Sequence, residues 1–163
     1  MAVRNCAEIG ENCHKIMRRL LADDDLVKLL YYSDVDPWSQ PNLTEEEKQE
    51  FVFNKLIKIT PRVGPKETAQ SIISIIVMNG VQNRDNSEFR DIKISINVFV
   101  PLTQWFMKSS NLRPFAIMGE VQKSLNGKTI NGLGKRTGGD FNLAFVSDEN
   151  SCYSQDFMIT TYE

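Results

Sequence analysis

Between residues 92 and 100 every second position holds isoleucine or valine, and this alternation constrains the fold more than any other feature of the chain. Successive side chains of a strand point to opposite faces, so the pattern predicts a strand with one apolar face. Residues 71–81 are apolar and rich in isoleucine, which predicts a strand buried on both faces. A short polar segment joins the two and predicts a long β-hairpin. The side chains expected to face the core are Ile94, Ile96 and Val98.

Helices are predicted before the hairpin. Apolar residues recur at helical spacing over residues 6–21, opposite charged ones, and predict an amphipathic helix. The aspartates that follow can cap a second short helix over residues 25–32. Thr44 and Glu47 form a capping-box pattern, which predicts a short acidic helix that can bury little. Residues 33–43 carry two prolines and no period, so we expect a loop or arm there.

The rest of the chain supplies three more strands and one helix. Residues 54–63 have the composition of a strand that ends near a proline, and Pro114 can begin a helix. The side chains that line one side of this helix at intervals of four are Ile117, Val121 and Leu125. Residues 140–146 and 153–162 read as a closing pair of strands with a polar turn between them.

This order predicts an α+β fold. The sheet is mostly antiparallel, is built on the long β-hairpin, and is packed by an N-terminal helix and one further helix. A length of 163 residues suits one core. We therefore expect a single domain over residues 1–163, with a helical N-terminal segment and arm at 1–50 and an α+β core at 51–163.

Charge and composition disfavour several classes of protein. The net charge is −2 and the isoelectric point is near 5.5, whereas a protein that coats nucleic acid is normally basic. The longest apolar run, residues 72–78, is far too short for a membrane span, and the N-terminus lacks the apolar stretch of a signal peptide. Cys6 and Cys13 would lie roughly 10 Å apart along a helix, too far for a disulfide. We expect reduced thiols in a cytosolic setting.

The segment at residues 126–139 holds five of the nine glycines and a Gly-Lys-Thr triplet. It is no P-loop, because the required first glycine is missing and a helix precedes the segment while a strand follows it. The segment does not match the dinucleotide-binding fingerprint either, because the third glycine of that pattern is displaced. The composition predicts a mobile loop, with a plain connecting loop as the alternative. The basic side chains at its tip, which suit contact with a neighbouring subunit or passing DNA, are Lys128, Lys135 and Arg136.

No catalytic or metal-binding arrangement is evident in the sequence. His14 would point about 100° away from Cys13 around the predicted helix, and Cys152 lies in a predicted turn, so neither a zinc site nor a nucleophile pair forms. Each cluster of acids can be explained as a helix cap, a turn or a match to the dipole of a first helical turn, with paired catalytic acids as the alternative. We therefore expect no catalytic residue, no cofactor and no metal. The open alternative is a small cytosolic enzyme whose site combines Asp34, Asp36, His14 and the glycine-rich segment.

Several aromatic residues lie in the N-terminal part, where they can either cover the core or anchor a protein interface. Trp38 stands in the proline-flanked arm, and both interpretations are open for it. The other interface candidates are Tyr31 and Tyr32. A monomeric adaptor or inhibitor that binds a host protein through Trp38 is a further open alternative.

Three stretches of sequence together resemble a known family. They are LLYYSDVDPWSQPNLT, LRPFAIMGEVQKSLNGK and FNLAFVSDENSCYSQDFMITTY. In order and spacing the chain resembles the tail-terminator and tail-completion (head-to-tail joining) proteins of tailed bacteriophages. In that family a helix that ends in Leu-Asn-Gly-Lys is followed by a loop and two terminal strands, and the resemblance covers most of residues 50–163.

The resemblance implies a non-enzymatic virion protein that is assembled in the host cytoplasm. Such proteins form rings, often hexamers, at the neck or the tail end, and DNA passes through the lumen. The implied partners are further copies of the same chain, neighbouring neck and tail-tube proteins, and transiently DNA. No membrane contact is implied.

Overall fold

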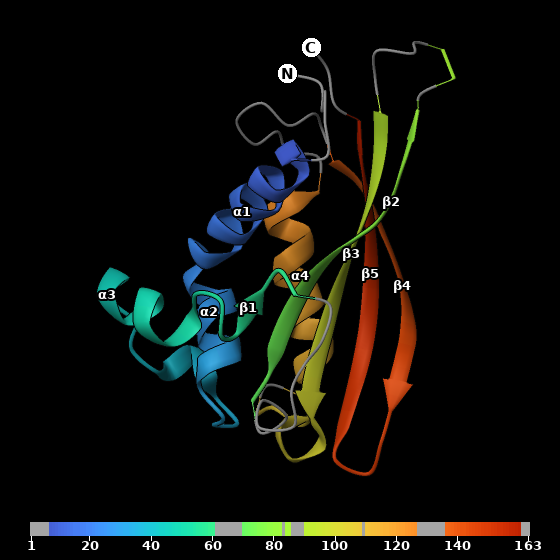
Figure 1. The fold of residues 1–163 in the computed structure, drawn as a ribbon. Coiled ribbons are helices and arrows are strands. Elements are labelled where there is room, and N and C mark those ends of the chain that lie inside the picture. Colours follow the sequence, from blue (N-terminus) through green and yellow to red (C-terminus); the bar gives the residue numbers. More distant parts are fainter. Residues whose placement is uncertain are drawn as a thin grey trace.

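The computed structural model describes residues 7–60, 70–82, 84–85, 90–108, 110–126 and 136–160. The order of elements is three helices, three strands, one helix and two strands, as the sequence predicts. Helices α1, α2 and α4 lie on one side of a five-stranded sheet (Figure 1). The α+β class with a mostly antiparallel sheet is therefore confirmed.

The strand order in the sheet is β1-β2-β3-β5-β4. Strand β2 (Ile72–Gln82) and strand β3 (Arg90–Pro101) form the predicted hairpin, and β5 (Asn150–Thr160) lies on the other side of β3. Strand β4 (Arg136–Val146) pairs only with β5, so it forms one edge. The short β1 (Ile57–Lys58) pairs with β2 in parallel, whereas the other pairs of described strands are antiparallel.

The hairpin has the predicted register. Ile94, Ile96 and Val98 are buried toward the helices, and Ile96 lies between Ile75 of β2 and Gln155 of β5. The expectation that β2 is buried on both faces is wrong for its second half. Residues 72–75 are buried, but residues 78–82 are exposed, because the hairpin extends beyond the layer of helices there.

The helices begin and end close to the predicted positions. Helix α1 spans Ala7–Leu21, and α2 (Asp24–Tyr31) is capped by Asp23, whose carboxylate accepts a hydrogen bond from the backbone N–H of Leu26 at 3.1 Å. Helix α4 spans Arg113–Leu125 with a proline in its first turn. The predicted buried side of α4 is confirmed for Ile117, Val121 and Leu125.

The segment between α2 and the sheet contains a single 3-10 turn (Pro37–Ser39) and the predicted capping box at Thr44. Helix α3 (Glu45–Glu47) buries none of its residues, as expected, but the chain continues as a π-helical turn (Lys48–Val52) that does bury side chains. Lys48 is buried there, 2.8 Å from a carboxylate oxygen of Asp24. Burial acts to lower the pKa of Lys48, but its hydrogen bonds with Asp24 and Glu45 raise that pKa overall.

The boundaries of two predicted segments are corrected. Within the described residues 54–60, the expected strand is reduced to the two residues of β1, because the chain turns before it and bends after it, while residues 61–63 lie outside the described part. The predicted glycine-rich loop ends earlier than expected, since Arg136 already belongs to β4, while residues 127–135 lie outside the described part of the chain.

Gly138 permits β4 to lie beside β5. Its φ is +148°, and a Cβ at this position would meet the backbone carbonyl oxygen of Asp156. We expect Gly138→Ala to lower the free energy of unfolding by about 1–3 kcal/mol and to loosen β4, because only backbone movement relieves the clash. Chemical denaturation and hydrogen exchange of residues 140–146 measure both effects.

Gly119→Ala is the matched control, since nothing lies within 4 Å of a Cβ built at this position in α4. Alanine there is expected to stabilise the helix by about 0.5–1 kcal/mol. Equal stability of the two variants would contradict the role assigned to Gly138.

Candidate functional site

The edge strand β4 is the first candidate for a functional surface. It is 11 residues long, and no described segment pairs with its outer side. An unpaired edge presents a row of backbone N–H and C=O groups to which another chain can pair. Proteins usually protect such edges with lysine, proline or a very short strand. Among the described side chains of β4 the only charged one is Asp140, although register shifts occur next to Asp140 and Phe145.

Large apolar side chains of β4 are exposed. Phe141 is 53% exposed and Leu143 is 55% exposed, and both lie on the side of the sheet that carries the helices. Phe145 and Val146 are also exposed. After the register shift that follows Leu143, Phe145 pairs with Cys152 and lies on the face away from the helices, whereas Val146 pairs with Ser151 and lies on the helix side. Phe115 of α4 extends this surface, with its ring 6.2 Å from that of Phe141. We call Phe115, Phe141, Leu143, Phe145 and Val146 the β4 edge patch.

A surface of this composition is suited to binding a protein. Contiguous exposed apolar side chains mark protein contacts more often than isolated ones do. Aromatic side chains supply much of the binding energy in such contacts. Tyr153 of β5 is half-buried and holds the patch in place, since its ring lies 5.2 Å from that of Phe115.

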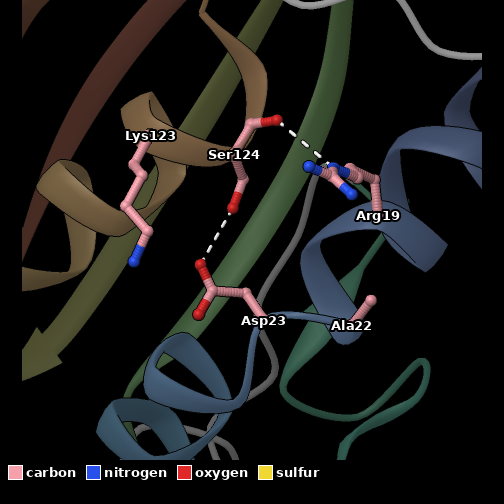
Figure 2. A pocket seen from close by; sticks show the side chains of 5 residues that line it. All are labelled: Arg19, Ala22, Asp23, Lys123 and Ser124. Carbon is pink, nitrogen blue, oxygen red and sulfur yellow. Dashed lines mark hydrogen bonds between the residues drawn. The ribbon is translucent and has the colours of Figure 1, made fainter.

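The second candidate is a small pocket of about 200 Å³ between the end of α1 and α4 (Figure 2). It is lined by Arg19, Ala22, Asp23, Lys123 and Ser124. The Ser124 hydroxyl donates a hydrogen bond of 2.9 Å to the Asp23 carboxylate. Ligand pockets usually measure about 300–1,000 Å³, so this pocket is smaller than a typical small-molecule site.

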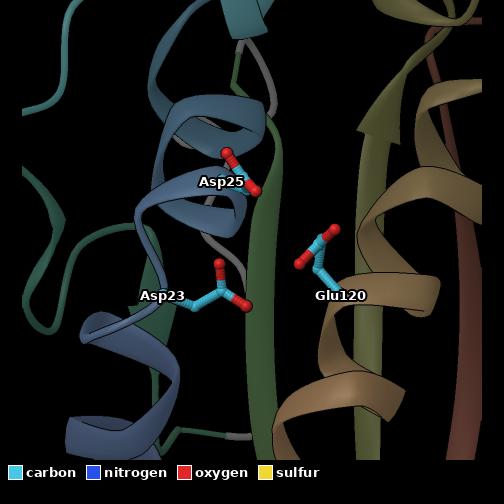
Figure 3. A group of neighbouring side chains, drawn as sticks. All are labelled: Asp23, Asp25 and Glu120. Atoms are coloured by element: carbon cyan, nitrogen blue, oxygen red, sulfur yellow. The ribbon is translucent and has the colours of Figure 1, made fainter.

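Three carboxylates meet beside this pocket. One oxygen each of Asp23, Asp25 and Glu120 lie within 4.8 Å of one another (Figure 3). Oxygen ligands of this kind suit a hard divalent cation. Both oxygens of Asp23 already accept hydrogen bonds, and Glu120 lies 2.7 Å from the ammonium group of Lys123. These contacts give the carboxylates a structural role, which joins the start of α2 to α4.

Burial raises the pKa of Glu120, and the charge of Asp23 raises it further, whereas Lys123 lowers it. A carboxyl group with a raised folded-state pKa stabilises the fold when protonated. Its contribution is complete below the unfolded-state pKa and is lost as the pH rises through the folded-state pKa. We therefore expect Glu120→Gln to increase the free energy of unfolding at neutral pH by roughly 0.5–1 kcal/mol. This gain should shrink as the pH falls toward about 4.

Urea denaturation over this pH range measures the effect of Glu120→Gln. Glu46→Gln is the control, because Glu46 is exposed on α3 and its replacement should leave the unfolding midpoint unchanged. A loss of stability in Glu120→Gln at neutral pH would show that the ion pair with Lys123 outweighs the repulsion among the acids.

The predicted contact residues are only partly described. Lys128 and Lys135 lie outside the described residues, and so does the side chain of Arg136. Trp38, Tyr31 and Tyr32 are half-buried and pack against the core, as the core interpretation expects. Whether these aromatic residues contact a partner stays a prediction.

Those residues of the enzyme alternative that the structure describes either lie on the surface or make structural contacts. His14 is exposed on α1 and joins no group of metal-ligating side chains there. Asp36 approaches Lys108 at 4.0 Å, while the backbone carbonyl of Asp34 accepts a hydrogen bond from Arg113. The sequence pattern gave no indication that Asp23 and Asp25 would meet Glu120, because only the packing of α2 on α4 joins them.

The cysteines that the structure describes are core thiols. Cys13 is buried, and burial raises its pKa. The sequence predicts a turn at Cys152, and this is wrong. Cys152 is a buried residue of β5, because the strand already begins at Asn150. Burial raises the pKa of Cys152 to about 12, although a backbone hydrogen bond from Val98 opposes this. A thiol of that pKa is a poor nucleophile at neutral pH.

Comparison with known families gives one finding. The family model described as YomW matches residues 23–156, from the cap of α2 into β5. No curated protein matches the chain at a significant level. Within the described ranges, no helix is long and apolar enough to cross a bilayer.

Proposed function

Because the chain belongs to the YomW family, a family of phage-like Bacillus proteins, we propose that it is a non-enzymatic structural protein of a phage virion. Its proposed place is the neck or the tail end, as a tail terminator or head-to-tail connector. There it forms a ring of six identical copies through which DNA passes.

The β4 edge patch is the observation that carries this proposal. A ring protein needs a surface that binds the next copy, and the patch joins an open strand edge to exposed aromatic and aliphatic side chains. The order of helices and hairpins agrees with the resemblance to tail-terminator and tail-completion proteins. The net charge of −2 suits a DNA conduit, because strong neutralisation of phosphates would retain DNA.

Deletion of the gene from its phage tests the proposal. We expect particles that fail at head-to-tail joining or tail completion, and restoration by the wild-type chain supplied in trans. Purified wild-type particles should contain the chain in a fixed copy number per virion, measured by quantitative mass spectrometry. Fully infectious particles without the chain would overturn the proposal. A monomeric adaptor or an enzyme would instead remain in the lysate.

The basic tip of the glycine-rich segment gives a separate prediction. Replacing Lys128, Lys135 and Arg136 together with alanine should leave the unfolding midpoint unchanged and reduce particle completion or DNA retention. The physical reason is that the positive tip is expected to contact acidic loops or DNA through screened electrostatic attraction. Particle titre and packaged DNA are the measurements. Full infectivity of the triple variant would favour a plain connecting loop.

A further inference from the structure

We propose that neighbouring copies of this chain bind through two different surfaces, an arrangement called a head-to-tail contact between subunits. In this contact the β4 edge patch of one copy, with the acids beside it, lies against the basic half of α1 on the next copy. The inference rests on the proposed function, because it presumes that copies of the chain touch. It specifies the two surfaces and their polarity.

The β4 side of this contact is acidic. Asp140 on the strand and Asp148 and Glu149 in the turn to β5 are all exposed. Over residues 140–149 they are the only charged side chains. Over residues 140–149, the β4 edge patch is therefore an apolar surface bordered by acidic side chains.

The second half of α1 is basic on its exposed side. His14, Arg18 and Arg19 are exposed and Lys15 is half-buried, opposite the side of the helix that packs into the core. Arg18 and Lys15 have no ion-pair partner among the residues that the structure describes. One exposed acid, Glu11, stands one turn earlier in the helix. This surface complements the charge that borders the β4 edge patch.

The same charges disfavour a contact between two β4 edges. A two-fold contact brings identical surfaces together. It would therefore place Asp140 and the turn acids of both copies close to one another, and like charges at an interface are repulsive. Figure 1 shows α1 and β4 on opposite sides of the molecule, so each copy can bind two neighbours in the same sense. Such a head-to-tail contact is the kind that closes into a ring.

The basic side chains can also cover the apolar part of the patch. Arginine and lysine lay their aliphatic stems on apolar surface, and a guanidinium group is attracted to the face of an aromatic ring. Phe115, Phe141 and Phe145 offer such rings at or near the edge. Arginine and aromatic side chains are both enriched in protein interfaces.

Charge reversal on each surface tests the inference. The first variant, Lys15→Glu with Arg18→Glu, makes α1 acidic. The second variant, Asp140→Lys with Glu149→Lys, makes the β4 edge basic. Supplied alone to the phage that lacks the gene, each should restore the titre at least about tenfold less well than wild type, because like charges then meet at every contact. Glu46→Lys on α3 is the matched control and should restore the titre fully, since Glu46 is exposed but belongs to neither of the two contact surfaces.

The decisive experiment supplies both variants together to the phage that lacks the gene. An acidic α1 then meets a basic β4 edge at one contact, and the wild-type surfaces meet at the next, so rings of alternating copies can form. We expect the titre to recover to within about threefold of wild type, with both chains present in equal amounts in the particles. Unchanged unfolding midpoints of the separate variants show that neither change acts through stability.

The outcomes separate this inference from the proposed function. If the wild-type chain is found in virions but either variant alone is fully active, or if the mixture is not rescued, the head-to-tail contact is wrong and the virion function stands. Full activity of the α1 variant alone, with loss of activity in the β4 variant, would indicate contact between two β4 edges. A wild-type chain that is absent from particles and sediments as a monomer overturns both.

Discussion

Replacing Arg113 with methionine is expected to lower the free energy of unfolding by about 3–5 kcal/mol, the largest effect that we predict for a single change. Arg113 is fully buried at the start of α4. Its guanidinium group donates hydrogen bonds to the backbone carbonyl oxygens of Gln104 at 2.9 Å, Leu29 at 2.7 Å and Tyr32 at 2.9 Å, and also to that of Asp34. Methionine fills much of the space but leaves these acceptors without their donors.

The reason for this large effect is the position of the acceptors. The carbonyls of Leu29 and Tyr32 lie at the end of α2, where carbonyl groups lack partners within the helix and a positive charge is favourable. Burial lowers the pKa of Arg113, and the charge of Asp34 opposes this. Arg113 thus joins α2, the arm that follows it and the start of α4 in one hydrogen-bonded network.

Two further variants make the Arg113 prediction sharper. Arg113→Lys should recover only part of the loss, because one ammonium group cannot reproduce the planar arrangement of guanidinium donors. Arg18→Ala should change the free energy of unfolding by less than about 0.5 kcal/mol, since Arg18 is exposed. Chemical denaturation measures all of them, and an Arg113→Met variant as stable as wild type would show that the hydrogen bonds have no net effect.

Ile96→Ala is expected to cost roughly 2–5 kcal/mol of unfolding free energy, the range for truncating a large buried aliphatic side chain. Ile96 has no exposed surface and lies in the middle of the central strand β3, between Ile75 and Gln155. The surrounding strands are held on both sides, so the cavity left by alanine can close only in part.

Val81→Ala is the control for the Ile96 variant, since Val81 belongs to the same hairpin but is 57% exposed. It should shift the denaturation midpoint by far less. Equal midpoints for Ile96→Ala and wild type would show that the side chains of β3 have the opposite orientation.

Much of the fold can be predicted from local patterns in this sequence. The alternation over residues 92–100 correctly predicts which side of β3 is buried, because a strand has only two faces. The capping box at Thr44 and the cap at Asp23 are both present, since such caps depend on side chains at most a few residues apart. The spacing of Ile117, Val121 and Leu125 likewise predicts the buried side of α4.

Features that depend on distant parts of the chain could not be predicted in this way. A basic residue at the start of a helix, such as Arg113, is unfavourable by helix-dipole reasoning, and only the packing of α4 on α2 supplies its carbonyl partners. The meeting of Asp23 and Asp25 with Glu120 has the same origin. The exposed half of β2 reflects how far the helices extend along the sheet.

The sequence by itself therefore determined the kinds of elements, their order and the buried sides of β3 and α4, because these follow from periodicity and from contacts within a few residues. The tertiary structure alone decided that β4 forms one edge of the sheet, opposite the edge with β1, since strand order depends on which elements pack together. The same apolar pattern in residues 140–146 would suit a buried strand. Its position at the edge of the sheet leaves these side chains exposed, as the surface that we propose to bind the next copy.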